Sequence, residues 1–385
     1  MIKVLLTDIF SRNCFDLFNI ITSMHPEYDP LLCDTNDSRF LFLKTPLIYG
    51  RICRRLRRKD SRIFNKDLLN ILKEQVDTPV VFVPIIMETI RLFYGFIREH
   101  SIHNLHYSLP PEESFAVAED KKKLSDFCRR SGIPVPREYG PVEIKNLRAS
   151  FRPVVAKPRG GIGAEGLYFI NRPEELKVLD TLSRKDYIIQ ERIGDTNAVQ
   201  GGFFLFREGE YISYYGHRRI RTFPPSGGVT VFSQYEENER IKKTGRLLLE
   251  KLRWSGLAMV EFLYDVKTDE YKVIEINPRV WGSFLLSEYS GADLLSGYLN
   301  ISLKKPLPPK HSRKKDVFIR WFFPFDLVNY LRSGGRIKGF WKFDREKTCF
   351  VGFTYSRIFR SLMYIFLTVF NLSFAKEFFK KMLRK

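Results

Sequence analysis

Apolar and polar positions alternate in blocks along the first third of the chain. Short apolar runs at residues 2–6, 28–33 and 80–83 are separated by segments in which apolar residues recur with helical spacing. Short apolar strands that alternate with helices are typical of an α/β layer with a parallel sheet. The pattern therefore predicts an α/β fold, with a Rossmann-like domain over residues 1–117.

The first predicted strand is not followed by a nucleotide fingerprint. Residues 7–11 read Thr-Asp-Ile-Phe-Ser, without the glycines of G-x-G-x-x-G. Those glycines let the pyrophosphate of a dinucleotide approach the backbone. We therefore expect that this first domain does not hold a dinucleotide.

The pattern changes near residue 118. A charged helix is predicted over residues 119–130, and a Gly/Pro-rich stretch, residues 131–136, ends it. Strands and helices then follow up to residue 303, and Pro306-Leu-Pro-Pro309 marks a break. We expect a second domain over residues 118–303 and a C-terminal extension over residues 304–385.

A glycine-rich hairpin is predicted early in the second domain. Two apolar runs flank a loop that contains Lys157, Gly160, Gly161 and Gly163. No GK[ST] follows and the second run is strand-like, so neither a P-loop nor a Rossmann turn fits. Such a loop can fold over a polyphosphate, because glycines let backbone N–H groups converge on it. The alternative is a flexible hairpin with a surface lysine.

A second hairpin is predicted from two apolar runs at residues 258–265 and 271–277. A five-residue loop over residues 266–270 would place Glu261 opposite Glu275, Leu263 opposite Val273 and Asp265 opposite Tyr271. Alternation along the strands then puts Glu261, Glu275 and Asn277 on one face.

Two carboxylates directly opposite each other repel, which favours a cation between them. Oxygen ligands without sulfur or imidazole favour Mg²⁺, with Mn²⁺ as an alternative. An exposed sheet face with salt bridges is the other interpretation of this hairpin.

The order of these motifs resembles the ATP-grasp superfamily, in particular carboxylate–amine ligases of the biotin carboxylase and carbamoyl-phosphate synthetase type. The resemblance rests on the lysine strand, the glycine-rich hairpin, Ile188-Ile-Gln-Glu-Arg-Ile193, and Glu261…Glu275-x-Asn277-x-Arg279. It covers about residues 1–303. It implies a two-lobed ATP-grasp domain, with ATP and Mg²⁺ as cofactors.

The resemblance also implies roles for individual residues. Lys157 would contact the α- and β-phosphates, Glu191 and the Ile193 backbone would hold adenine, and Arg279 would steady the transferred phosphoryl group or the acyl phosphate. Glu261, Glu275 and Asn277 would bind two Mg²⁺ ions. A lysine at the start of the domain, Lys121 or its neighbours Lys122 and Lys123, would join the phosphate contacts. Asp195 and Asn197 are the candidates for the ribose contact.

Three arginines precede the metal hairpin. Arg218, Arg219 and Arg221 lie just before a Pro/Gly-rich turn. In a strand, Arg219 and Arg221 share a face and Arg218 points away. The segment resembles the basic strand that faces the γ-phosphate and the acceptor carboxylate in biotin-carboxylase-like ligases, and an arginine fork suits both anions. The alternative is a solvated basic strand.

These features together predict an enzyme that activates a carboxylate as an acyl phosphate for attack by an amine or a similar nucleophile. The expected partners are a small-molecule carboxylate and a small-molecule amine. Two other hypotheses stay open: a phosphotransferase with the same ATP site, and a non-enzymatic basic protein that binds membrane or nucleic acid. Nucleic acid is the less favoured partner, and the sequence does not indicate an oligomeric state.

Charge is concentrated at the C-terminal end. Of 64 basic and 44 acidic residues, 20 basic but only 5 acidic residues lie at 304–385, together with 19 of the 56 aromatic residues. The net charge of +20 is thus mainly a property of this extension.

The five cysteines form no C-x-x-C pair, and no segment has the length or leader pattern for membrane insertion or secretion. We therefore expect a cytoplasmic protein.

The extension contains an amphipathic pattern over residues 357–375, which predicts a largely helical tail. One interpretation is a helix packed on the body of the protein. The other is an anchor at the inner face of the membrane, where basic residues near an anionic leaflet each contribute about 1 kcal/mol.

Overall fold

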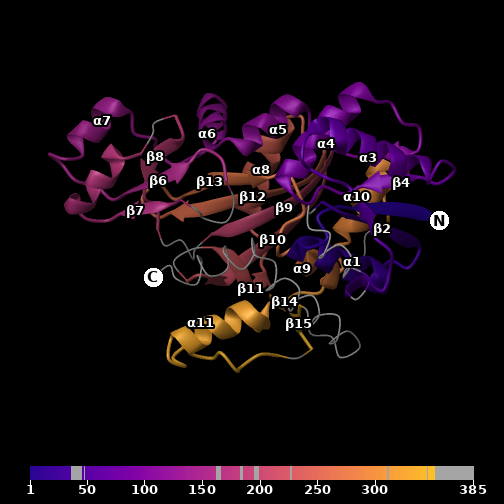
Figure 1. Cartoon of the computed structure of the whole chain (residues 1–385). Coiled ribbons are helices and arrows are strands. Elements are labelled where there is room, and N and C mark those ends of the chain that lie inside the picture. Colours follow the sequence, from indigo (N-terminus) through magenta and orange to yellow (C-terminus); the bar gives the residue numbers. More distant parts are fainter. Residues whose placement is uncertain are drawn as a thin grey trace. The chain divides into compact units, whose positions relative to one another are not determined.

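The computed structural model describes residues 1–35, 46, 48–161, 166–182, 185–194, 199–225, 228–309, 312–344 and 346–351. Contacts divide the chain into two compact units. Unit 2 comprises residues 110–229 and 236–277. Unit 1 comprises residues 1–109, residues 230–235 and the described residues from 278 onward (Figure 1).

Unit 1 contains a five-stranded sheet in which every pairing is parallel. The strand order is β3-β2-β1-β4-β5. The strands are β1 (Ile2–Leu6), β2 (Tyr28–Asp34), β3 (Arg54–Arg55), β4 (Val80–Phe82) and β5 (Leu105–His106), and the helices between them are α1 (Arg12–Met24), α3 (Ser61–Lys73) and α4 (Met87–Glu99). The predicted α/β fold is confirmed.

Local sequence explains where these helices begin. The Ser11 side chain accepts a hydrogen bond from the Cys14 N–H at the start of α1, and Asp60 does the same for the Ile63 N–H at α3. Both residues are good N-caps because their short side chains satisfy amide groups that have no partner within the helix.

The C-terminal part of unit 1 adds helices and two short strands. Its elements are α9 (Leu285–Tyr289), α10 (Leu294–Ser302), β14 (Phe318–Arg320), the turn η3 (Phe322–Asp326), α11 (Leu327–Arg332) and β15 (Thr348–Phe350). β14 lies between β11 (Val229–Tyr235), which is antiparallel to it, and β15, which is parallel. The described start of the extension therefore packs within unit 1. The amphipathic segment 357–375 lies outside the described residues.

Unit 2 contains two separate antiparallel sheets. The strands are β6 (Val154–Pro158), β7 (Tyr168–Ile170), β8 (Tyr187–Glu191), β9 (Gln200–Arg207), β10 (Glu210–Phe223), β12 (Gly256–Asp265) and β13 (Glu270–Asn277). One sheet has the order β7-β6-β8, and the other runs β13-β12-β9-β10. The helical elements are α5 (Glu112–Glu119), α6 (Lys121–Arg130), α7 (Pro141–Asn146), η1 (Pro173–Asp180) and α8 (Glu239–Lys251). Each sheet has its own buried cluster, as the two-lobed prediction requires.

The larger sheet of unit 2 has two different faces. Phe204, Val260 and Phe262 pack into an apolar core with residues of α6 and α8, such as Leu124 and Leu248. Because side chains alternate along a strand, the neighbouring positions of β9 and β12 point to the opposite face. The candidate site lies on that opposite face.

A membrane-spanning helix was not expected from the sequence. Among the described residues, no helix combines the length and the apolarity that crossing a bilayer requires.

Candidate active site

Two carboxylates lie opposite each other in the β12–β13 hairpin. Glu261 pairs with Glu275, and Met259 pairs with Asn277. Glu261 and Asn277 are only 6% and 7% exposed. The predicted pairing of Glu261 with Glu275 is confirmed, and the alternation along β13 puts Glu275 and Asn277 on the same face.

The rest of the predicted register is wrong. Leu263 pairs with Lys272 and Asp265 pairs with Glu270, because a β-bulge next to Glu261 shifts the register by one residue. The turn is therefore shorter, with four residues, 266–269, between the paired ends. The Asp265 carboxylate accepts hydrogen bonds from the Lys267 N–H at 3.0 Å and the Thr268 hydroxyl at 3.2 Å, which favours this tight turn.

Arg219 contacts one of the predicted metal ligands, Glu261. Its Nη2 donates to Glu261 Oε1, and both side chains are largely buried. Arg218 instead pairs with Glu236 at 2.8 Å, in an exposed position. Arg221 follows Arg219 by two residues and so lies on the same face of β10. Arg219 and Arg221, the two arginines proposed for the site, thus lie on one face of β10, and Arg218 lies on the other, as the alternation of side chains predicts.

His217 is a candidate site residue that sequence reasoning missed. His217 of β10 pairs with Gly201 of the adjacent strand β9. Gly201 pairs on its other side with Glu261 of β12. His217, Gly201, Glu261 and Glu275 therefore form one row across four strands. The imidazole is 2% exposed, and neither ring nitrogen has a hydrogen-bond partner. Burial, with the nearby Arg219 charge, lowers the pKa of His217 to about 3, so the ring is neutral.

Gly201 makes room for this histidine. A Cβ at position 201 would lie 2.2 Å from His217 Nε2 and 2.4 Å from its Cδ2. The ring also packs against Phe203, with 4.6 Å between the ring centroids. The imidazole therefore lies over the backbone of β9, and only glycine leaves space for it.

Lys157 lies in β6 of the smaller sheet, as predicted. Burial, with the nearby Lys121 charge, lowers the pKa of Lys157 to about 8, while Glu275 and Glu261 oppose that effect. Lys121, Glu261 and Glu275 are therefore each close enough to Lys157 to act on its charge. At neutral pH the ammonium stays largely charged, ready to pair with an anion.

Lys121 is fixed at the start of α6. Its backbone N–H donates to the Arg159 carbonyl at 2.9 Å. The guanidinium of Arg159 in turn binds both oxygens of Asp120, at 3.1 Å from Nε, and Asp120 caps α6 through the Lys122 and Lys123 N–H groups. Of the three lysines, Lys121 is the one that acts electrostatically on Lys157.

The glycine-rich segment follows β6, which is antiparallel to β7. Gly161 has φ +110°, a conformation that favours glycine, and no atom lies within 4 Å of a Cβ built on Gly160 or Gly161. Among the described residues, none therefore fills the space above these two glycines. Gly163 lies outside the described residues.

Glu191 belongs to a buried ionic network. Its Oε1 accepts from Lys272 Nζ at 2.7 Å and from the Arg137 N–H at 2.9 Å, and Lys272 also contacts Asp265 at 2.8 Å. Lys272, which sequence reasoning missed, thus connects β13 of one sheet with β8 of the other. Ile193, the other predicted adenine contact, is 7% exposed, and Asp195 and Asn197 lie outside the described residues.

Arg279 belongs to unit 1. It is 8% exposed, and its Nη1 donates to the Val280 carbonyl at 3.0 Å. The residues that the structure brings together in unit 2 are therefore Lys121, Lys157, Arg219, Glu261, Glu275 and Asn277, with His217 in addition.

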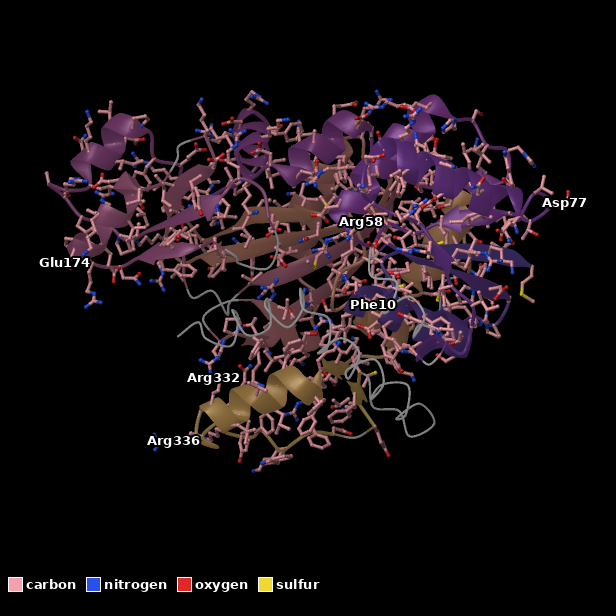
Figure 2. The ribbon with its side chains drawn as sticks, in the orientation of Figure 1. Phe10, Arg58, Asp77, Glu174, Arg332 and Arg336 are labelled. Atoms are coloured by element: carbon pink, nitrogen blue, oxygen red, sulfur yellow. The ribbon has the colours of Figure 1, made fainter. Side chains whose placement is uncertain are left out.

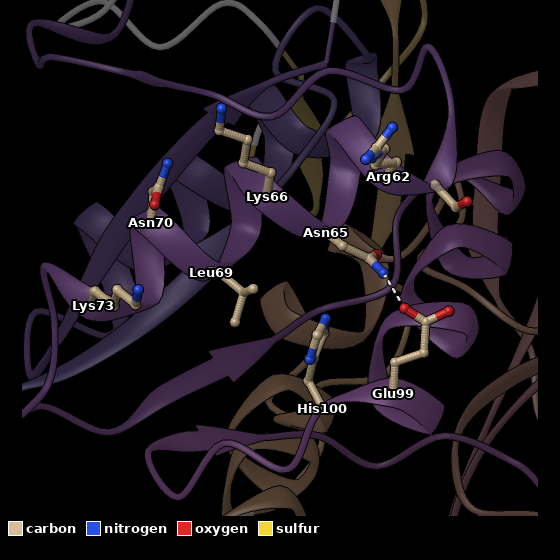
Figure 3. A pocket seen from close by; sticks show the side chains of 9 residues that line it. Arg62, Asn65, Lys66, Leu69, Asn70, Lys73, Glu99 and His100 are labelled. Atoms are coloured by element: carbon tan, nitrogen blue, oxygen red, sulfur yellow. Dashed lines mark hydrogen bonds between the residues drawn. The ribbon is translucent and has the colours of Figure 1, made fainter.

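A polar depression of about 500 Å³ lies elsewhere, on unit 1 (Figure 3). It is lined by Arg62, Lys66 and Lys73 of α3 and by Glu99 and His100, and Asn65 donates to Glu99 at 2.8 Å. None of the predicted site residues lines it.

The cluster in unit 2 fits a magnesium nucleotide. Glu261, Glu275 and Asn277 offer oxygen atoms of the kind that Mg²⁺ prefers. Arg219 now compensates the Glu261 charge, which shows that this face accommodates a cation beside that carboxylate. Lys157 and Lys121 supply positive charge for the phosphates, and the space over Gly160 and Gly161, which no described residue fills, suits their backbone approach.

Residues 118–283 match a family model described as the ATP-grasp domain. The N-terminal section of the carbamoyl phosphate synthase large chain from Methanopyrus kandleri is 22% identical over 208 residues, which are 50% of this chain and 36% of that protein. The chain spans between 9% and 36% of the length of the curated relatives that it matches.

Solved structures share the fold. Biotin carboxylase from Campylobacter jejuni is similar with a TM-score of 0.60 and 14% identity, covering 82% of this chain and 74% of that one. N5-carboxyaminoimidazole ribonucleotide synthetase from Thermus thermophilus is similar with a TM-score of 0.57 and 16% identity, covering 81% of each chain. Residues 118–283 therefore belong to the ATP-grasp domain family, and the solved structures share the fold of this chain.

Proposed function

We propose that the protein is an ATP- and Mg²⁺-dependent ligase that joins a carboxylate to an amine. The observation that carries the proposal is the convergence in unit 2 of paired carboxylates, Glu261 and Glu275, with Arg219 and Lys157. Carboxylates that bind a metal, beside cations that bind phosphate, are the groups that ATP-dependent phosphoryl transfer needs.

The proposed nucleotide roles are those that the resemblance to ATP-grasp ligases implies. Lys157 and Lys121 would bind the α- and β-phosphates, with the glycine-rich segment that contains Gly160, Gly161 and Gly163 as a further phosphate contact. Glu191 and Ile193 would position adenine; because the Glu191 carboxylate already binds Lys272, we assign its contact to the backbone. Asn197 is the proposed ribose contact.

The metal and the arginines would neutralise the negative charge of the phosphates and of the acceptor carboxylate. Glu261, Glu275 and Asn277 would hold Mg²⁺, or Mn²⁺ as an alternative, which neutralises phosphate charge when it is bound. Arg219 and Arg221 would bind the acceptor carboxylate and the γ-phosphate, and Arg279 would steady the transferred group. A metal at Glu261 would replace the Arg219 contact and release that guanidinium towards substrate.

The proposed reaction has two steps. A carboxylate oxygen attacks the γ-phosphorus, the bond from that phosphorus to the β–γ bridging oxygen breaks, and ADP leaves. The amine nitrogen then attacks the acyl carbon, inorganic phosphate leaves, and the nitrogen loses a proton to water. Electrostatic stabilisation of the developing charge is the main contribution expected from the protein.

The names of the similar proteins agree with this class of reaction. Among the solved structures are a biotin carboxylase domain with MgADP and bicarbonate and an N5-carboxyaminoimidazole synthase with ADP and 5-aminoimidazole ribonucleotide. An ATP-consumption screen of carboxylic acids against amines, with Mg²⁺ present, tests the proposal. Consumption that needs both substrates and yields a product joined by an amide bond supports it.

The two rival hypotheses give other results. A phosphotransferase would form a stable phosphorylated product without an amine, which mass spectrometry of the product detects. A non-enzymatic basic protein would not hydrolyse ATP, and its binding to nucleic acid or anionic lipid would weaken steeply with salt.

We infer a location at the cytoplasmic face of a membrane from the C-terminal part of the chain. Leu331 and Trp341 are 65% and 58% exposed, and Arg332, Arg336 and Lys338 lie between them in sequence. Figure 2 labels Arg332 and Arg336 in this part of the chain. Exposed apolar side chains with basic neighbours suit an anionic lipid surface. Co-sedimentation with vesicles tests this: binding that needs anionic lipid and weakens in Trp341→Ala supports it, and failure to bind either vesicle type refutes it.

A further inference from the structure

Three metal-binding side chains meet in unit 1, apart from the proposed ATP site. His25 follows α1, Glu288 lies in α9, and Asp293 precedes α10. His25 Nε2 lies 3.4 Å from Glu288 Oε2 and 3.8 Å from Asp293 Oδ1. The three potential ligand atoms all lie within 4.8 Å of one another.

Two of these atoms are buried without a hydrogen-bond partner. His25 is 8% exposed and Glu288 is 2% exposed, and neither Nε2 of His25 nor Oε2 of Glu288 forms a hydrogen bond. A buried polar atom without a partner costs free energy, and a buried carboxylate costs more. With Asp293 beside them, the site holds two carboxylates and one imidazole.

The remaining polar atoms are already oriented by neighbours. His25 Nδ1 lies 3.3 Å from the Ser296 hydroxyl, which can accept a hydrogen bond from it. Glu288 Oε1 accepts from the Leu295 N–H at 3.2 Å, and from the Ser287 hydroxyl at 3.3 Å. Metal-binding histidines and carboxylates are usually fixed in this way, with one atom held by a neighbour and the other left for the metal.

We propose that His25, Glu288 and Asp293 bind a divalent transition metal ion, with zinc as the first candidate. Zinc–ligand bonds of about 2.0–2.2 Å in a tetrahedron place ligand atoms about 3.3–3.5 Å apart. The observed 3.4 Å and 3.8 Å are close to those edges. One imidazole with two carboxylates favours zinc over Mg²⁺, and water would take the fourth position.

The ion would have a structural role within unit 1. His25 follows the N-terminal helix α1, whereas Glu288 and Asp293 belong to a segment more than 260 residues later in the chain. A metal bound by all three would tie these distant segments together. The competing explanation is an ion pair between protonated His25 and Glu288 without any metal.

The experiment uses the full-length protein after removal of metal by a chelator. Zinc alone is titrated calorimetrically, and Co²⁺ is titrated by visible absorption, because four-coordinate Co²⁺ absorbs far more strongly than the six-coordinate ion expected at an oxygen-rich magnesium site. The variants are His25→Ala and Asp293→Asn. Asparagine keeps the N-cap acceptor and tolerates the αL conformation of residue 293 (φ 47°, ψ 50°), but it removes the charge. Glu113→Gln, at an exposed carboxylate of α5, and His103→Ala are the matched controls.

We expect one zinc ion per chain and a four-coordinate Co²⁺ spectrum in the wild type and in both controls. Losing a ligand should weaken zinc binding at least about tenfold, as changes around metal sites commonly do. If His25→Ala does not fold, Asp293→Asn decides the test. Absence of zinc binding, a six-coordinate spectrum only, or unchanged affinity in Asp293→Asn would overturn the proposal and leave the simple ion pair.

Discussion

Replacing Lys157 by methionine should stabilise the free protein at neutral pH and weaken ATP binding. Burial lowers the pKa of Lys157 from its ordinary value of 10.5 to about 8. Between these two values the unfolded chain binds more protons than the folded one, so stability rises with pH across that window. Below pH 8 the cost of the charged ammonium is fully present, and methionine avoids it.

The size of the effect follows from the same two values. At about 1.4 kcal/mol per pH unit, the difference between 10.5 and about 8 corresponds to about 3 kcal/mol. This figure is a ceiling, because the side chain is only half-buried and water screens part of the charge. The stability advantage of the variant should be largest at pH 7 and should vanish near pH 10.5.

Urea unfolding of both proteins at pH 7, 8.5 and 10, followed by circular dichroism, measures the difference directly. Other groups that titrate in this range are common to both proteins and cancel. Lys145→Met, on the exposed surface of α7, is the control and should show no such trend. A stability difference that does not change with pH, or a variant less stable than wild type at pH 7, would refute the reasoning.

Further substitutions test single contacts. Gly201→Ala should displace His217 and cost about 1–3 kcal/mol of unfolding free energy in urea melts, whereas Gly160→Ala, with no atom near its Cβ, should cost far less. Lys272→Met leaves Asp265 and Glu191 without their shared cation and should lower the unfolding free energy by about 3–5 kcal/mol; a loss under 1 kcal/mol would contradict the network. Arg219→Ala should lower kcat about 100-fold or more, while Arg218→Ala should leave turnover near the wild-type value; equal effects would remove Arg219 from the site.

Alternation in two apolar strands was enough to predict the centre of the site. One face of β12 packs into the core, so Glu261 had to point to the other face. The predicted five-residue loop put Glu275 opposite it, and the shorter turn of the structure gives the same pair because the bulge offsets the missing residue. The β-bulge was not predictable, because a single extra residue leaves no mark in the apolar pattern. It changed the register near the turn but not at the two carboxylates.

Long-range pairing explains what sequence reasoning missed. In the sequence, His217 precedes the arginines that were predicted to bind anions. Its side chain fits only because Gly201 lies beside it. That neighbour is known only from the pairing of β9 with β10. In the sequence, Lys272 has the position of an ordinary surface residue of a strand. Its contact with Glu191 was not predictable, because Glu191 lies in the other sheet of unit 2. The strands around Lys157 were predictable because the glycine-rich loop marks the hairpin in the sequence.

Calorimetric titration of wild type and Glu275→Gln with ATP, with and without Mg²⁺, tests the central claim most directly. The substitution keeps the shape of the side chain but removes one of the two opposed charges. We predict that the wild type binds ATP only weakly without Mg²⁺, and that Glu275→Gln loses at least about tenfold in MgATP affinity, equivalent to about 1.4 kcal/mol, with an unchanged circular dichroism spectrum. MgATP binding of equal strength in both proteins, or ATP binding that ignores Mg²⁺, would contradict the account.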